Sequence, residues 1–242
     1  MSGVGRVDLA RGYLLHRRDF RDTSLILELF TREHGRLTAF ARGARGPRGR
    51  FGALQPFQPL LLSWSGRGEA GQLRGAEAER VELALPPPAL MSAFYVNELL
   101  MKLTARHDAH PEIYDAYEQV LAGLRAQGAL EYLLRSFELQ LLAWLGYGLH
   151  LEAEADSGQP VRADAYYHFE LQSGVRACAA DAEQAVRGQV LLALAGHEPL
   201  SAAADQRQAR QLMRRALDRC LEGRELATRK VARAIHRTEN RD

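Results

Sequence analysis

Four arginines stand close together in the segment FARGARGPRGRFGALQPF, residues 40–57. Guanidinium groups donate paired, planar hydrogen bonds that match the oxygens of a phosphate. Glycines between the arginines allow a close approach of the backbone, and the flanking rings of Phe40 and Phe51 can stack on bases. No Asp or Glu occurs from Gly35 to Gly68, so sequence neighbours cannot neutralise this charge. The segment predicts a nucleic-acid site formed by Arg42, Arg45, Arg48 and Arg50.

A second group of cations lies near the carboxyl terminus. Arg229, Arg233 and Arg237 repeat at intervals of four residues beside Lys230, and this spacing places the arginines on one face of a helix. The pattern predicts a second DNA-binding patch. A solvated basic helix face explains the same spacing equally well.

Other motifs resemble catalytic or metal-binding sites, but the sequence around them does not support such a site. The segment GRGEAG, residues 66–71, matches G-x-G-x-x-G but lies between two strand-like runs, whereas a dinucleotide site needs a following helix. His107 and His110 lack a third ligand, and Cys178 and Cys220 stand alone and far apart. We therefore expect no catalytic residues, no metal, no cofactor and no disulfide framework.

Composition bounds the class of protein. The chain has 242 residues and a net charge of +2, yet its first 57 residues carry eleven Arg against five acids. No apolar run approaches the roughly 20 residues that a membrane span requires. The opening MSGVGRVDLARGYLL lacks the apolar core of a secretory signal. These features predict a cytoplasmic protein without membrane contact.

The first part of the chain, residues 1–85, has the pattern of short strands separated by Gly and Pro. Because closure removes exposed strand edges, five strands in so short a segment predict a small closed β-barrel. The basic segment described above is its long loop. The expected strands are residues 12–16, 24–31, 36–42, 59–65 and 72–83.

After Pro86, Pro87 and Pro88 the apolar residues repeat with the helical period. We expect residues 86–242 to form a mostly α-helical domain, which makes the fold class α+β. An irregular insertion is expected at about 147–180, with a strand at 166–171, and helices resume at Asp181 as the N-cap. The expected helices begin near residues 90, 111, 130, 181, 205 and 225.

Two stretches of this sequence resemble the bacterial RecO recombination mediators. RDTSLILELFTREHGRLTAFARGAR, followed by GALQPFQPLLL, is similar to the amino-terminal barrel of that family. YVNELLMKL and LLRSFELQLLAWLGYGLHL are similar to its helical domain. The resemblance covers nearly the whole chain and ends with GRELATRKVAR.

The resemblance implies an OB-fold at the amino terminus and a protein of DNA recombination and repair that is not an enzyme. Such proteins bind single- and double-stranded DNA, anneal complementary strands, engage the acidic tail of the single-stranded DNA-binding protein SSB, and act with RecR to load RecA. The implied DNA-binding residues are Arg36, Arg42, Arg45, Arg48 and Arg50. The implied SSB-tail site is Arg135, with Leu134 and Leu142 as pocket neighbours.

Many members of that family hold zinc through four cysteines in the region that here reads LHLEAEADSGQ to GVRACAAD. This chain keeps only Cys178 there. We therefore expect the insertion to pack without zinc.

Two other functions remain open from the sequence. An OB-type RNA-binding module of the translation apparatus would use the same barrel and arginines, and it would prefer structured RNA to single-stranded DNA. A protein-interaction scaffold with a basic face that only confers solubility would bind DNA weakly or without salt dependence.

Overall fold

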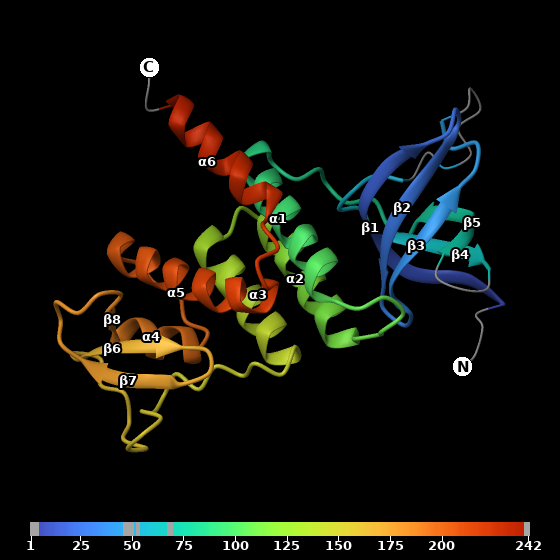
Figure 1. Ribbon diagram of the computed structural model, residues 1–242. Coiled ribbons are helices and arrows are strands. Elements are labelled where there is room, and N and C mark those ends of the chain that lie inside the picture. The colour runs from blue at the N-terminus through green and yellow to red at the C-terminus, as the bar shows by residue number, and fades with distance from the viewer. Residues whose placement is uncertain (1–4, 46–50, 52–53, 67–69, 240–242) are drawn as a thin grey trace. The chain divides into compact units, whose positions relative to one another are not determined.

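The computed structural model describes residues 5–45, 51, 54–66 and 70–239, apart from the side chains of 236–239. Within these residues the amino-terminal part forms a closed barrel of five strands (Figure 1). The α+β fold class and the five-stranded barrel are confirmed. The barrel strands are β1 (Arg6–Phe20), β2 (Ser24–Thr31), β3 (Gly35–Ala41), β4 (Leu60–Ser65) and β5 (Ala70–Ala78).

The barrel closes because the first strand is long enough to pair on both of its edges. The strand order around the barrel is β1-β2-β3-β5-β4, and β1 also pairs with β4. All of these pairs are antiparallel except β3 with β5. This closed five-stranded arrangement is the OB-fold that the resemblance implies. The strands that flank the GRGEAG segment pair antiparallel, which suits hairpin glycines rather than a dinucleotide site.

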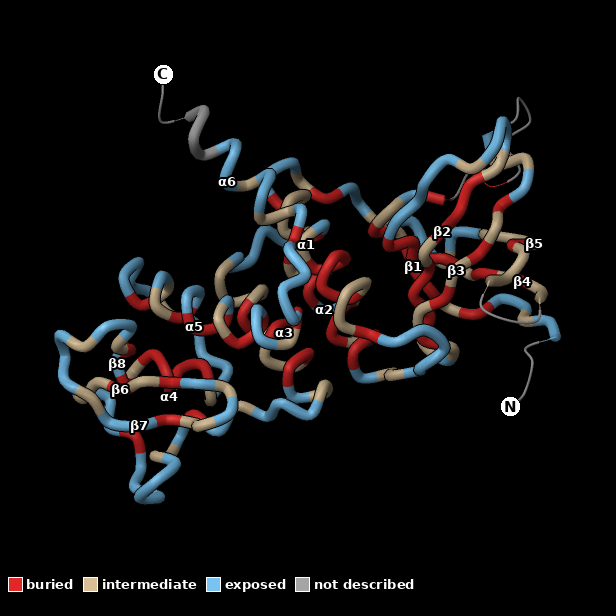
Figure 2. Tube along the Cα trace, in the orientation of Figure 1, coloured by how far each residue is buried: buried red, intermediate tan, exposed pale blue. Residues whose placement is uncertain are grey.

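The barrel core follows from the alternation of apolar residues along the strands. Leu27 and Leu29 of β2 are fully buried, and Leu37 and Ala39 of β3 face the same interior. In Figure 2 the barrel strands contain buried (red) segments, while the turn between β1 and β2 is exposed. Part of the outer face is also buried, since Phe30 of β2 packs against Tyr114 and Tyr117 of α2 (Pro111–Arg125). Functional side chains must be sought on the rest of that face or at the ends of the barrel.

The chain divides into two compact units, Met1–Leu121 with Leu226–Asp242, and Ala122–Glu225. The change from strand to helix lies at the three prolines as predicted, but the first unit also contains helices. These are α1 (Pro87–Leu103), the first part of α2 (Pro111–Arg125), and α6 (Ala227–Glu239).

Asn97 of α1 joins the barrel to α2. Its side chain is 1% exposed, and its amide donates a hydrogen bond to the Leu15 carbonyl of β1 at 2.9 Å. The Tyr117 hydroxyl of α2 donates to the Asn97 amide oxygen at 2.7 Å. Because a buried polar group without partners costs about 1–3 kcal/mol, this arrangement fixes where α1 meets β1 and α2.

Glu98, the next residue of α1, caps the last helix. Its carboxylate accepts hydrogen bonds from the backbone N–H groups of Ala227 and Thr228, at 2.7 and 2.9 Å, and from the Thr228 hydroxyl at 2.7 Å. Burial by itself raises the pKa of Glu98, but these hydrogen bonds outweigh burial and the pKa is lowered. The charged carboxylate thus satisfies the donors at the start of α6 and complements its dipole.

We expect Glu98→Gln to lower the free energy of unfolding by about 1 kcal/mol at pH 7, because a helix cap is lost. A carboxyl whose pKa is lower in the folded state stabilises the fold above its unfolded pKa of about 4.3, and this stabilisation disappears as the pH falls further. The difference between wild type and variant should therefore shrink below about pH 4.3 in urea titrations. Glu33→Gln, an exposed change in the β2–β3 turn, is the control; a pH-independent difference at Glu98 would contradict the cap.

The second unit combines helices with a small sheet. Its helices are α3 (Leu130–Trp144), α4 (Gly188–Ala195) and α5 (Ala203–Leu221). In the described residues the sheet has three strands in the order β7-β6-β8. The strands are β6 (Tyr166–Glu170), β7 (Gly174–Cys178) and β8 (Val186–Arg187).

The sheet corrects two expectations for this region. The insertion is irregular only over residues 147–165, because β7 pairs with the predicted strand β6, and β8, which follows the insertion, pairs with β6 as well. Helix α4 begins at Gly188 rather than at Asp181, since residues 186–187 are engaged in the sheet. Glycine is required at 188, where an added Cβ would collide with the carbonyl of Arg162.

Apolar packing holds the insertion together. Val175 and Tyr167 are 0% and 1% exposed, and the Tyr167 hydroxyl accepts a hydrogen bond from the Arg162 backbone N–H at 2.9 Å. Burial raises the pKa of both Cys178 and Cys220. Among the described residues, no group of three or more His, Cys, Asp or Glu side chains is placed to hold a metal ion. No helix in the same residues is long and apolar enough to cross a membrane.

Candidate nucleic-acid interface

Two aromatic rings lie side by side on the outer face of the barrel. Strand pairing sets Arg18 of β1 opposite Ile26 of β2, and Ile26 opposite Phe40 of β3. Side chains directly opposite each other share a face of the sheet, and Phe20 follows Arg18 by two residues on that face. The rings of Phe20 and Phe40 are 5.4 Å apart, and both residues are partly exposed. Together they form an aromatic surface on which a base can stack.

Exposed arginines surround this aromatic pair. The Arg21 guanidinium lies 5.2 Å from the centre of the Phe20 ring. Arg18 and Arg42 are exposed, and neither has an ionic or hydrogen-bonding partner among the described residues. Gln72 of β5 is the partner of Phe40 in the β3–β5 pair, and the exposed Arg74 follows it by two residues. We call this surface the barrel face: Phe20 and Phe40 with Arg18, Arg21, Arg42 and Arg74.

Arg45 lies in the turn that follows β3, next to the β1–β2 turn. Its backbone N–H donates to the Thr23 carbonyl at 3.0 Å, and its guanidinium forms an ion pair with Asp19 at 2.8 Å. The side chains are 41% and 71% exposed. Such a surface pair contributes about 0–1 kcal/mol, so a phosphate can replace the Asp19 carboxylate. The absence of acids in the neighbouring sequence therefore did not exclude a partner from another strand.

Arg36 was predicted to bind DNA, but its guanidinium is largely buried and has a structural role. Its side chain is 11% exposed and pairs with Glu28 at 2.9 Å. It also donates a hydrogen bond to the Thr104 carbonyl at 2.8 Å. Burial lowers the pKa of Arg36 and Glu28 acts in the opposite direction, with a net lowering. The guanidinium joins β2 and β3 to the end of α1, and it is not available to a phosphate.

Phe51 is also corrected, because its ring is 8% exposed and belongs to the barrel core. It therefore offers no free face to a base. Arg48 and Arg50 lie outside the described residues. The barrel face includes four residues that motif reasoning missed: Arg18, Phe20, Arg21 and Arg74. Arg18 and Phe20 could have been found from the segment RRDFR, residues 17–21, because alternate residues of a strand lie on the same face.

The second predicted patch lies on α6. Lys230 and Arg233 are exposed, and the guanidinium of Arg229 lies 5.8 Å from the centre of the Tyr95 ring of α1. The side chain of Arg237 lies outside the described residues. The helix therefore presents cations to solvent, and their role in DNA binding stays a prediction.

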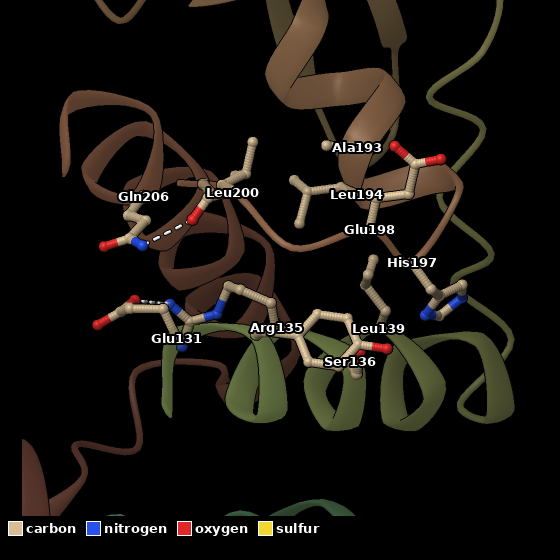
Figure 3. A pocket seen from close by; sticks show the side chains of 12 residues that line it. Glu131, Arg135, Ser136, Leu139, Ala193, Leu194, His197, Glu198, Leu200 and Gln206 are labelled. Carbon is tan, nitrogen blue, oxygen red and sulfur yellow. Dashed lines mark hydrogen bonds and ion pairs between the residues drawn. The ribbon is translucent and has the colours of Figure 1, made fainter. Parts of the chain in front are cut away.

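The predicted tail site is a small pocket beside α3 (Figure 3). Arg135 lines it together with Tyr132 and Leu139 of α3, and residues of α4 and α5 complete the wall. Its volume of about 20 Å³ accommodates one water-sized group. A terminal carboxylate fits this space, whereas an aromatic side chain requires the walls to move.

Arg135 is held by two acids of its own helix. Its side chain is 10% exposed and forms ion pairs with Glu138 at 2.6 Å and with Glu131 at 3.4 Å. Glu138 is itself 1% exposed. The pocket neighbours also differ from those expected. Leu142 is buried and Leu134 half-buried, and neither lines the pocket. Leu134 projects from another face of α3, and Leu142 lies on the same side as Arg135 but about two turns farther along the helix.

Comparison with known proteins agrees with this architecture. Residues 8–81 match the family described as Recombination protein O N terminal, and residues 87–230 match Recombination protein O C terminal. A DNA repair protein RecO of Methylococcus capsulatus is 47% identical over 95% of this chain and 94% of its own length. One of Alkalilimnicola ehrlichii is 45% identical over 98% of this chain and 95% of its own. The chain therefore belongs to the RecO family of DNA repair proteins.

Proposed function

We propose that this protein is a recombination mediator that binds single- and double-stranded DNA through its barrel face and catalyses no bond chemistry. The observation that carries the proposal is the Phe20–Phe40 pair within a ring of exposed arginines. Rings and cations together are the combination by which OB-folds bind single strands. The relatives named DNA repair protein RecO support recombinational repair as the process.

The same surface accounts for strand annealing without ATP. Two complementary strands repel each other through their phosphates, and binding to one cationic surface lowers that repulsion while releasing counterions. Bases stacked on Phe20 or Phe40 keep their pairing edges free, because stacking uses only the ring faces. Annealing then needs proximity alone.

We further propose that the Arg135 pocket receives the tail of SSB. The guanidinium can exchange its Glu131 contact for the terminal carboxylate of the tail, since the 3.4 Å ion pair is the longer of its two. Docking there would bring the protein to SSB-coated DNA in the cytoplasm, at the nucleoid during repair. We also propose that the protein acts with RecR to load RecA, as its resemblance to the RecO mediators implies.

The barrel face is tested by removing its cations. We expect a variant that replaces four arginines of the barrel face with glutamine to lose roughly two orders of magnitude in affinity for single-stranded DNA. Each exposed contact contributes about 1 kcal/mol or less. The slope of log K against log salt should fall by about 0.7 per lost phosphate contact. The measurement is fluorescence anisotropy with a labelled oligonucleotide between about 50 and 200 mM salt. The changes are Arg18→Gln, Arg21→Gln, Arg42→Gln and Arg74→Gln.

The matched control also removes four exposed arginines, each already paired with an acid: Arg6→Gln, Arg162→Gln, Arg176→Gln and Arg210→Gln. It should keep most of the affinity. Equal losses in both variants would mean that only net charge matters, and tighter binding of structured RNA than of single-stranded DNA would favour the translation module instead.

A further inference from the structure

A second, larger pocket lies between α5 and the turn that follows β6. Its volume is about 440 Å³, within the range of small-ligand sites. Two arginines one helical turn apart, Arg215 and Arg219, project from α5 into its wall. Gln172 and Gln184 contribute side-chain amides. All of these groups belong to the second unit.

Arg215 is half-buried and has no carboxylate or hydrogen-bond acceptor among the described residues. Burial alone lowers its pKa, with no acid acting against it. Within the part of the chain that the structure describes, the Arg219 guanidinium donates only to the neutral Gln172 side chain, at 3.1 Å. A partly desolvated guanidinium without an anion is costly, so the pocket is arranged to gain from binding one.

The local charge selects a singly charged anion. Glu170 and Asp218 also line the pocket, and Asp218 pairs with Arg214 at 3.7 Å. The three guanidiniums of Arg214, Arg215 and Arg219 against these two carboxylates leave one positive charge. Glu170 repels every anion, but the single charge of a phosphodiester balances the one positive charge of the pocket. An acidic peptide or a doubly charged phosphate would leave uncompensated negative charge beside Glu170.

We propose that this pocket binds one backbone phosphate of a nucleic-acid strand, with Arg215 and Arg219 as its cationic ligands. The proposal rests on the nucleic-acid binding inferred above and gives the strand a second point of attachment. A phosphodiester with its sugar fills a space of this size, and the amides of Gln172 and Gln184 supply further donors to the phosphate oxygens.

The test is anisotropy with a labelled oligothymidylate and the full chain carrying Arg215→Gln. We expect about fivefold weaker binding and a salt slope reduced by about 0.7, the value for one lost contact to a single strand. Arg207→Gln is the control, since Arg207 is exposed on the same helix and does not line the pocket. If Arg215→Gln does not fold like the wild type in a melting curve, Arg219→Gln takes its place.

The outcomes separate this inference from the proposed function. If the wild type binds and the barrel-face variant is weak, but Arg215→Gln behaves like Arg207→Gln, the pocket is not a strand site and only this inference fails. If the wild type does not bind, the proposed function fails as well. A second readout uses thermal midpoints with the dinucleotide TpT or inorganic phosphate at equal ionic strength. Stabilisation by TpT that Arg215→Gln abolishes supports the inference, and stabilisation by inorganic phosphate alone overturns it.

Discussion

Replacing Arg135 with alanine will lower the free energy of unfolding of the second unit by about 3 kcal/mol, because it removes one partner of a buried ion pair. Glu138 is 1% exposed and loses the guanidinium that lies 2.6 Å from its carboxylate. Urea denaturation followed by circular dichroism measures this loss. Arg210→Ala is the control, since that side chain is 55% exposed where it pairs with Glu131, and it should cost less than about 1 kcal/mol.

The same pair decides how the SSB-tail proposal must be tested. A loss of tail binding in Arg135→Ala alone would not distinguish a missing ligand from an unfolded unit. Replacement of a buried ion pair by apolar residues is often neutral in stability, so the double variant Arg135→Met/Glu138→Leu should stay folded. We expect it to bind the tail peptide roughly thirtyfold more weakly, as for the loss of an arginine that anchors an interface, and to keep its affinity for naked DNA. Unchanged tail binding in the folded double variant would place the tail elsewhere.

Replacing Phe20 and Phe40 together with leucine will weaken binding of single-stranded DNA by roughly 10- to 100-fold, because each stacked base contributes about 1–3 kcal/mol. Duplex DNA should be affected far less, since its bases are already stacked inside the helix and its phosphates still meet the arginines. The comparison is anisotropy with the same oligonucleotide, single-stranded and annealed to its complement.

Phe94→Leu provides the matched control for the aromatic pair. Phe94 is 42% exposed on α1, its ring packs against that of Phe57, and it is not one of the residues of the barrel face. Its replacement should leave both affinities unchanged. Equal losses for single-stranded and duplex DNA in the Phe20/Phe40 variant would show that the rings support the fold of the barrel rather than contact bases.

Periodicity predicted the elements best where it was long and uninterrupted. The strand at 24–31 and the helices beginning at 111 and 130 agree with the structure within a residue or two. It failed around β7 and β8, which are short strands of mixed polarity. Such strands form because β6 supplies hydrogen-bond partners, and no local pattern carries that information.

The family resemblance was decisive for the class of protein, yet it misassigned individual side chains. Arg36 lies in the matching motif, but strand pairing brings Glu28 beside it. Leu134 and Leu142 are near Arg135 in sequence, but Leu134 projects from another face of α3 and Leu142 lies about two turns beyond the pocket that Arg135 lines. Each error came from treating sequence neighbours as spatial neighbours.

The amino-acid sequence by itself determined the change from strands to helices at the three prolines, the excess of arginine near the amino terminus and the membership in the RecO family. These properties depend on local spacing and composition, which can be read from the sequence without knowing any tertiary contact. The tertiary structure decided which arginines face solvent, that Phe20 and Phe40 meet, and that Arg215 lacks an anion. Those outcomes depend on strand register and on helix faces that pair residues far apart in the chain, and such pairing sets the burial and partners of each charge.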